Sequence, residues 1–189
     1  MFIERHEWWT TPVWERQTEF DKEFNSALLK ETSNLNPKKN GDDFNIWDLD
    51  TPNITILKAK IFDTAKQLTD NWFNSDYEFT PKILRGWISF QKPHELLPLH
   101  DHGGVVISAV YYISTPENCG DLLLVDPRSS SNWNQETDKG ITGIRYKRII
   151  PKDGKLVLFP GYISHMVEPN RSNQIRISLA TNIVKKISQ

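Results

Sequence analysis

The sequence predicts a mainly β protein, a sandwich or barrel of short strands with a helical layer at its N-terminal end. After residue 76 the chain consists of short runs rich in β-branched and aromatic residues, separated by Gly and Pro turns. Helical periodicity is confined to residues 1–75. With 189 residues, 38% of them hydrophobic, the chain can bury the core of one domain. We therefore expect a single domain over 1–189, with a helical support layer at 1–75 and a β core at 76–189.

Two helices are expected in the support layer. Thr51 suits an N-cap and Pro52 suits the first helical position, so a helix should begin there and run to about residue 73. Its apolar residues recur at three- and four-residue steps: Ile54, Leu57, Ile61, Ala65, Leu68 and Trp72. A weaker, earlier helix is indicated by Phe20, Phe24, Ala27 and Leu28. Residues 34–43 form the polar loop between them, and both helices should pack on one outer face of the β structure.

Seven strands are expected in the β core. They lie at about 82–91, 104–114, 121–125, 143–150, 155–159, 164–168 and 174–184. The polar segment 127–140 has no periodicity, and the sequence leaves open whether it is a lid or a surface loop. Trp87 is expected in the core, whereas Asn182 suits a structural role and a place at the edge of a site equally well.

Charge and cysteine content restrict the partners and the compartment. The formal net charge is −1 and the chain has no long run of Lys or Arg, so we expect no nucleic-acid partner. Cys119 is the only cysteine, which excludes an intrachain disulfide and favours a reducing compartment. No apolar stretch reaches the length of a membrane span. We expect a cytoplasmic protein without a membrane partner, and the sequence does not indicate its oligomeric state.

Three of the five histidines form a pattern that is typical of a metal site. His100 and His102 are separated by one residue, and His165 follows a Phe-Pro-Gly turn. Two imidazoles at alternate positions of a strand point to the same face, so they can converge on one metal ion. Arg176 lies eleven residues after His165, and its guanidinium offers a planar fork to an anionic co-substrate.

Together with neighbouring motifs, these residues resemble the Fe(II)/2-oxoglutarate-dependent dioxygenases, in particular the prolyl-hydroxylase-like branch. The resemblance covers roughly residues 86–184, and each motif is weak alone but stands in the family's order. The matching positions are His100 and His102, Tyr111 and Tyr112, Gly120 and Asp121, His165, and Arg176 with Ser178. The resemblance implies a double-stranded β-helix, which is a jelly-roll, cupin-like barrel.

The resemblance also implies an activity and its cofactors. Iron(II) would be held by His100, His102 and His165, with positions left for 2-oxoglutarate and O2. The co-substrate would be held by Arg176, Ser178 and Tyr112, and by Ser108 on the same face of its strand as Tyr112. The expected reaction is hydroxylation of a peptide side chain (prolyl-like) or of a small molecule, with release of succinate and CO2.

One position departs from the family's pattern. Its second ligand is usually a carboxylate, and this chain has His102 there. Three interpretations stay open: a site of three histidines, a local bulge that turns Asp101 onto the metal, or a ligand from elsewhere, such as Asp121 or water. A histidine in place of a carboxylate would leave the site one unit more positive, which should weaken metal retention and strengthen the attraction for an anionic co-substrate.

A cupin-like metal-binding protein without oxygenase turnover is the alternative function. A cupin motif would have a Glu three or four residues after the second histidine, where this chain has Val105 and Val106. The sequence therefore favours the oxygenase.

Overall fold

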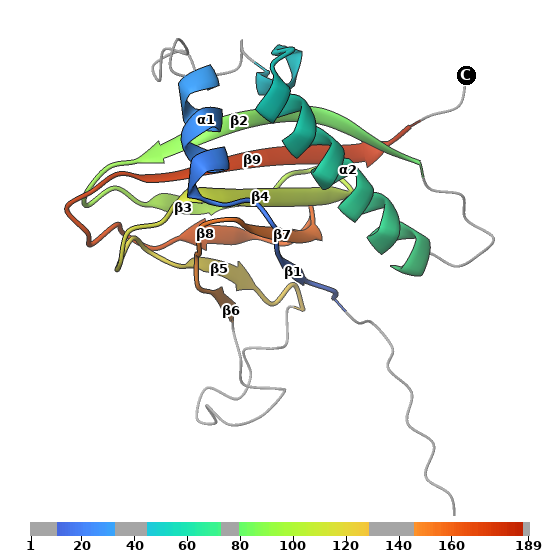
Figure 1. Ribbon diagram of the computed structural model, residues 1–189. Coiled ribbons are helices and arrows are strands. Elements are labelled where there is room, and N and C mark those ends of the chain that lie inside the picture. Colours follow the sequence, from blue (N-terminus) through green and yellow to red (C-terminus); the bar gives the residue numbers. More distant parts are fainter. Residues whose placement is uncertain (1–10, 33–44, 73–79, 129–145, 187–189) are drawn as a thin grey trace, which may run out of the picture.

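The computed structural model describes residues 11–32, 45–72, 80–128 and 146–186, and its strands form two antiparallel sheets (Figure 1). The larger sheet has the order β1 (Trp14–Gln17), β7 (Lys155–Pro160), β4 (Ile107–Ser114), β9 (Arg176–Lys185) and β2 (Pro81–Gln91). The smaller sheet has the order β3 (Leu97–His100), β8 (His165–Val167), β5 (Leu122–Val125) and β6 (Tyr146–Ile149). The expected mainly β fold is confirmed.

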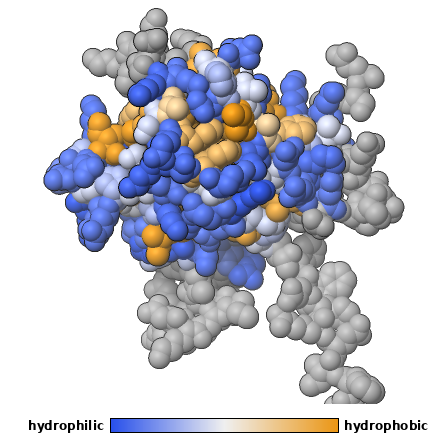
Figure 2. Space-filling model, viewed as in Figure 1, coloured by the Kyte–Doolittle hydropathy of each residue, from blue (hydrophilic) through white to orange (hydrophobic). Residues whose placement is uncertain are grey.

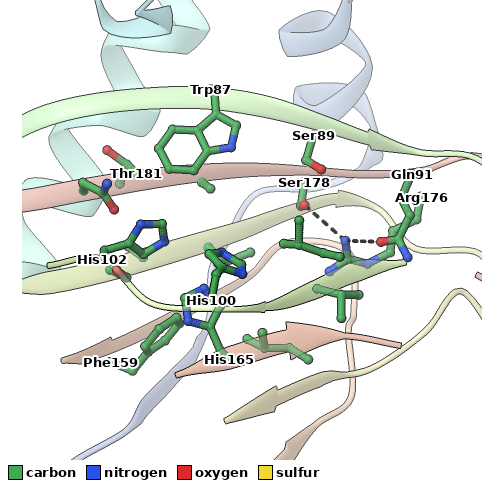
Figure 3. A pocket seen from close by; sticks show the side chains of 18 residues that line it. Trp87, Ser89, Gln91, His100, His102, Phe159, His165, Arg176, Ser178 and Thr181 are labelled. Carbon is green, nitrogen blue, oxygen red and sulfur yellow. Dashed lines mark hydrogen bonds between the residues drawn. The ribbon is translucent and has the colours of Figure 1, made fainter. Parts of the chain in front are cut away.

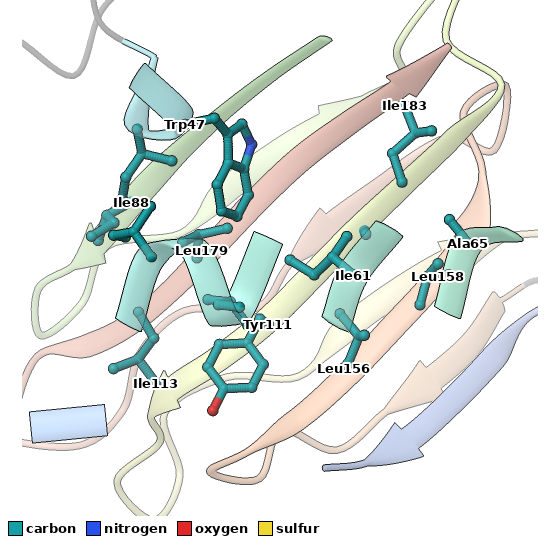
Figure 4. Close-up of a cluster of buried hydrophobic side chains, with 14 of the residues drawn as sticks. Trp47, Ile61, Ala65, Ile88, Tyr111, Ile113, Leu156, Leu158, Leu179 and Ile183 are labelled. Atoms are coloured by element: carbon teal, nitrogen blue, oxygen red, sulfur yellow. The ribbon is translucent and has the colours of Figure 1, made fainter. Parts of the chain in front are cut away.

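Two helices, α1 (Lys22–Thr32) and α2 (Pro52–Trp72), lie on the same side of the larger sheet (Figure 1). The residues of α2 at helical spacing are fully buried, as the sequence predicts: Ile54, Leu57, Ile61 and Ala65. They pack on outward-facing side chains of the sheet, which include Ile88, Ile107, Tyr111, Leu156, Leu158, Leu179 and Ile183 (Figure 4). This cluster is the main core, and it packs the helices against the outer face of the larger sheet.

The N-terminus of α2 is capped differently from the sequence prediction. Thr51 was expected to cap it, but the Thr51 hydroxyl instead donates to the Glu31 carboxylate, 2.7 Å away. The same carboxylate accepts from the backbone N–H groups of Asn53 and Ile54 at 3.2 Å. A charged acceptor from α1 therefore satisfies the free N–H groups at this end, which also joins the two helices.

Two short strands lie where no strand was predicted. β1 falls within the region expected to be helical and pairs with β7, with Trp14 opposite Leu158. β3 contains Pro98 and pairs only with β8. Four-residue strands at a sheet edge carry too little periodicity to be recognised, and proline weakens the signal further. The predicted loop 34–43 and most of the segment 127–140 lie outside the described residues.

A tryptophan fixes the helical layer against the strands that carry the site. The Trp47 indole N–H donates to the Thr181 hydroxyl at 2.8 Å, and its ring passes directly over Gly86 on β2. A Cβ at Gly86 would lie only 2.1 Å from the Trp47 Nε1 atom. Glycine is therefore required at this close approach.

The surface seen from the helical side is mostly hydrophilic, with apolar side chains gathered over and between α1 and α2 (Figure 2). Among the helices that the structure describes, none has the length and apolar character needed to cross a membrane.

Candidate functional site

A cavity of about 260 Å³ lies between the inner faces of the two sheets (Figure 3). Its walls combine polar and apolar side chains. They include Trp87, Ser89, Gln91, His100, His102, Ser108, Val110, Leu122, Phe159, His165, Arg176, Ser178, Ala180 and Asn182. The three predicted histidines and the predicted arginine therefore open onto one space.

The three histidines converge from two strands and a turn. His100 ends β3 and is paired with His165 on β8, while His102 lies just after β3 rather than on it. The ring nitrogens of His100, His102 and His165 that face one another all lie within 4.8 Å. The structure thus brings the predicted triad together, although the expected single strand for His100 and His102 ends between them.

A close backbone contact positions the turn that carries His102. The His102 N–H donates to the Gly161 carbonyl at 3.1 Å, and the Gly161 N–H donates to the Val106 carbonyl at 3.1 Å. A Cβ at Gly161 would lie 2.4 Å from the Val105 carbonyl oxygen. The Phe-Pro-Gly turn therefore has a structural function, because only glycine allows this approach.

Two of the imidazoles are oriented by backbone carbonyls. His100 Nδ1 lies 2.8 Å from the Pro98 carbonyl oxygen, and His165 Nδ1 lies 2.9 Å from that of Ile163. A carbonyl oxygen only accepts, so Nδ1 carries the proton and Nε2 keeps its lone pair. Such a contact orients a metal-binding imidazole and fixes its tautomer.

Burial favours the uncharged form of two of the imidazoles, those of His102 and His165. Burial lowers the pKa of His165 to about 4. Burial also lowers the pKa of His102, and the neighbouring His100 acts in the same direction. Neutral imidazoles are the form that binds a metal ion.

No carboxylate joins the triad in the described part of the chain. The Asp101 side chain is exposed to solvent. Asp121 is bound to Arg148, with 2.8 Å between its Oδ2 and the Arg148 Nη1. Neither alternative ligand considered from the sequence lies in position, which leaves the three histidines as the candidate donor set.

The opposite end of the cavity, which we call the arginine end, is built around Arg176. Its side chain is only 2% exposed and has no carboxylate partner among the described residues. Nη1 donates to the Gln91 Oε1 at 3.2 Å and to the Ser178 hydroxyl at 3.4 Å, whereas Nε has no partner (Figure 3). The guanidinium carbon lies 5.2 Å from the centre of the Tyr112 ring, and the Tyr112 hydroxyl is also unpartnered. A buried cation with free donors is suited to bind an anion.

Gln91 is a site residue that the sequence analysis missed. Its Nε2 donates to the carbonyl oxygens of Glu95 and Glu168 at 2.7 and 2.9 Å, which turns Oε1 towards Arg176. The amide is therefore held in one orientation by two backbone contacts. Alternation along β2 was the available signal, because Gln91 lies on the same face as Trp87 and Ser89.

The strand register separates Ser108 from the arginine end. Tyr112 is paired with Ser178, whereas Ser108 is paired with Asn182. Four residues of strand span about 13 Å, so Ser108 cannot share a carboxylate with Tyr112. The register therefore places Ser108 apart from Arg176, Ser178 and Tyr112, the residues with which it was grouped. The side-chain face was right, but alternation does not fix the position along the strand.

Trp87 also differs from its expected place. It is only half-buried and lines the cavity beside the triad, with its ring centre 6.1 Å from that of His102. It is paired with Ala180, and the small side chain there leaves room opposite the histidines.

Comparison with known proteins assigns the family. Residues 85–182, more than half of the chain, match the family described as "Putative 2OG-Fe(II) oxygenase". The chain belongs to this family of 2-oxoglutarate- and iron(II)-dependent oxygenases. No curated protein matches the chain by sequence.

Several solved structures share the fold. A prolyl-4-hydroxylase from Pseudomonas putida is 15% identical, with 94% of this chain and 90% of that chain covered and a TM-score of 0.64. HygX from Streptomyces hygroscopicus with iron bound is 12% identical, with 94% and 84% covered and a TM-score of 0.63; it has also been solved with nickel and 2-oxoglutarate. An oxidoreductase of the 2OG-Fe(II) oxygenase family from Burkholderia pseudomallei is 13% identical, with a TM-score of 0.54. The match covers 73% of this chain and 61% of that one.

The cavity of this oxygenase fits the cofactors of its family, which are iron(II), 2-oxoglutarate and O2. Three imidazoles form a donor set suited to iron. The buried polar side-chain atoms without a partner in the described residues are Ser108 Oγ, Tyr112 OH, Arg176 Nε and Asn182 Oδ1. All four residues face inward on β4 or β9, so the inner face of the larger sheet offers unpartnered polar atoms to which a ligand can bind.

Proposed function

We propose that this oxygenase hydroxylates a peptide side chain (prolyl-like) or a small molecule, with iron(II) held by His100, His102 and His165 and 2-oxoglutarate held by Arg176, Ser178 and Tyr112. One observation carries the proposal. Three imidazoles and a buried, uncompensated guanidinium open onto the same cavity.

Arg176 has the properties required to bind the distant carboxylate of 2-oxoglutarate. A buried cation without a counter-charge costs several kcal/mol of folding free energy. A carboxylate from outside the chain would remove that cost and could accept from the unpartnered Arg176 Nε. The folding free energy that this uncompensated charge costs the ligand-free protein is therefore recovered as binding free energy for an anionic co-substrate.

Tyr112 and Gln91 complete the arginine end. Burial raises the pKa of Tyr112 to about 12, although the Arg176 charge acts in the opposite direction, so the hydroxyl remains protonated. It can donate to the carboxylate that Arg176 binds. Gln91 acts on Arg176 itself, because its oriented Oε1 fixes the guanidinium without neutralising its charge.

Iron(II), 2-oxoglutarate and O2 would supply an oxidative decarboxylation that yields succinate and CO2, with one oxygen atom passing to succinate and the other to the hydroxylated substrate. The chain contributes position and the exclusion of water. His100 and His165 are held by the backbone contacts of their Nδ1 atoms. The apolar side chains of Leu122, Phe159 and Val167 line the cavity.

The substrate class rests on similarity in fold and on the half-buried Trp87, which lines the cavity beside the triad. The Pseudomonas putida protein is a prolyl-4-hydroxylase. We expect a prolyl-like side chain to bind next to Trp87, the aromatic residue that lines the cavity beside the triad.

Addition of Fe(II) and 2-oxoglutarate without oxygen should give a visible charge-transfer absorption. Admission of air should then release succinate, even without a substrate. Iron-loaded protein that gives neither signal would refute the proposed function.

The metal ligands are tested by a matched pair of variants. His102→Ala should lose iron after gel filtration, whereas Asp101→Ala should retain it, because Asp101 is exposed and lies outside the triad. The reverse result would mean that Asp101 is the ligand.

A further inference from the structure

We infer that Asn182 and Ser108, at the end of the cavity opposite Arg176, bind the substrate through a hydrogen-bond donor that the substrate supplies. We call this pair the asparagine end. The inference rests on the proposed function, because it concerns the part of the cavity that 2-oxoglutarate, bound as proposed, would not occupy.

The strand register gives the distance between the two ends. On β9 the residues that line the cavity follow in the order Arg176, Ser178, Ala180 and Asn182. Each step of two residues covers about 6.6 Å, so Asn182 lies about 20 Å along the strand from Arg176. Trp87, opposite Ala180, is the residue beside the histidines. The asparagine end therefore lies beyond the triad as seen from Arg176.

A 2-oxo acid cannot satisfy the Asn182 oxygen of the asparagine end. Asn182 Oδ1 is buried and has no partner, and an amide oxygen only accepts. Ionised 2-oxoglutarate carries acceptors and no donor, and its chain would reach from the triad towards Arg176. A ligand that pairs with Asn182 Oδ1 must present an N–H or O–H group, which points to a second molecule.

Ser108 makes the asparagine end a formed site. It is opposite Asn182 in the pairing of β4 with β9, it is only 3% exposed, and its hydroxyl lines the cavity without a partner. A buried hydroxyl without a hydrogen bond is costly, so a ligand that contacts it gains affinity. The Ser108 hydroxyl can donate or accept, so it fits either kind of ligand group. The Asn182 oxygen only accepts, and it therefore requires a hydrogen-bond donor from the ligand.

Trp87 indicates what lies next to that donor. Arg85, which is paired with Asn182, lies two residues before Trp87 on β2, and its guanidinium lies 6.0 Å from the centre of the half-buried Trp87 ring. A flat or apolar group can pack on the indole while its neighbouring N–H or O–H reaches Asn182. The substrate class is therefore a neutral amide or hydroxyl compound with an apolar group beside the donor. A peptide and a small molecule can both provide this chemistry.

A pair of probes isolates the donor. N-benzylacetamide has an aromatic ring and an N–H group, and N-benzyl-N-methylacetamide has the same ring without the N–H. Both are titrated calorimetrically into protein loaded anaerobically with Fe(II) and 2-oxoglutarate. The first should bind about tenfold more tightly, because the second leaves the Asn182 oxygen unpaired.

Two variants assign the preference to Asn182. Asn182→Leu should abolish the tenfold difference, whereas Asn182→Asp, which keeps an acceptor oxygen at the same position, should retain it. Equal affinity of the two probes for the wild type, no binding of either, or a preference that survives Asn182→Leu would each overturn the inference. Failure of the loaded protein to bind 2-oxoglutarate in the first place would instead refute the proposed function.

Discussion

Tyr111 and Tyr112 are neighbours on β4, but their side chains lie on opposite faces of the larger sheet and differ in one respect. Both are fully buried. The Tyr111 hydroxyl donates to Asn25 Oδ1 at 2.7 Å, within the core beneath the helices, whereas the Tyr112 hydroxyl has no partner. The outer face of the sheet has its polar groups satisfied by the protein itself, and the inner face leaves them for ligands. The outer face should therefore govern stability, and the inner face should sacrifice stability for binding.

Arg176 tests this contrast most strongly. Arg176→Met should weaken 2-oxoglutarate binding about 100-fold or more, because the substitution removes the only charge at the arginine end. The same change should raise the stability of the ligand-free protein by roughly 1–3 kcal/mol, since it replaces a buried, uncompensated cation with an apolar side chain. Equilibrium binding and urea unfolding measure the two effects.

Iron retention is the control for that variant, because Arg176 does not contact the histidines. Loss of iron together with 2-oxoglutarate would mean that Arg176 is a structural residue. Arg176→Lys should fall between wild type and Arg176→Met, since it keeps the charge and loses the planar fork.

The pH dependence of the metal-free protein tests the histidine triad. The folded state holds the pKa of His165 at about 4, below the ordinary value of 6.5. Above pH 6.5 the residue is neutral in both the folded and unfolded states and has no effect. As the pH falls from 6.5 to 4, the unfolded chain binds a proton that the folded protein does not, so stability should decrease by on the order of 3 kcal/mol.

Urea unfolding of metal-free protein at a series of pH values measures that decrease. His165→Gln should remove most of it, because the glutamine side chain does not titrate. An identical pH dependence in the variant would show that other groups cause the loss.

Gln91 tests whether the arginine end needs an uncharged partner. Gln91→Glu should place a carboxylate beside Arg176 and remove the two N–H contacts to Glu95 and Glu168. The KM for 2-oxoglutarate should rise about tenfold or more, with a smaller change in kcat, because the internal carboxylate competes for the guanidinium. An unchanged KM would mean that Gln91 does not position Arg176.

Periodicity explains which parts of this architecture could be predicted from the sequence. The helix that begins at Pro52 and the alternating faces of β4 and β9 each repeat over many residues, so they were recognised. β1 and β3 are too short to show a period, and the cap of α2 comes from Glu31, a residue in another helix. The triad could be recognised because histidine is a rare residue type and the three histidines follow the motif order of the family that the sequence resembles.

The parts of the site that were missed depend on register. Alternation places Ser108 on the inner face with Tyr112, but only the pairing with β9 shows that it lies opposite Asn182. The same holds for Gln91, whose role depends on the carbonyl groups of two loops that are distant in sequence. Trp87 has the composition of a core residue, and its place in the cavity follows from the space left by Ala180.

The tyrosine pair gives the smallest effects and compares the two faces most directly, because the same atom is removed on each face of one strand. Tyr111→Phe leaves Asn25 Oδ1 buried without its donor, so the free energy of unfolding should fall by about 1–2 kcal/mol while the affinity for 2-oxoglutarate stays unchanged. Tyr112→Phe breaks no internal hydrogen bond, so stability should change by less than about 0.5 kcal/mol, whereas 2-oxoglutarate binding should weaken about fivefold through the lost donor. Urea unfolding and equilibrium binding give the free energy of unfolding and the 2-oxoglutarate affinity of each variant. If Tyr112→Phe were the more destabilising change, the inner face would be a second core, and the division between a stabilising and a binding face of this sheet would be wrong.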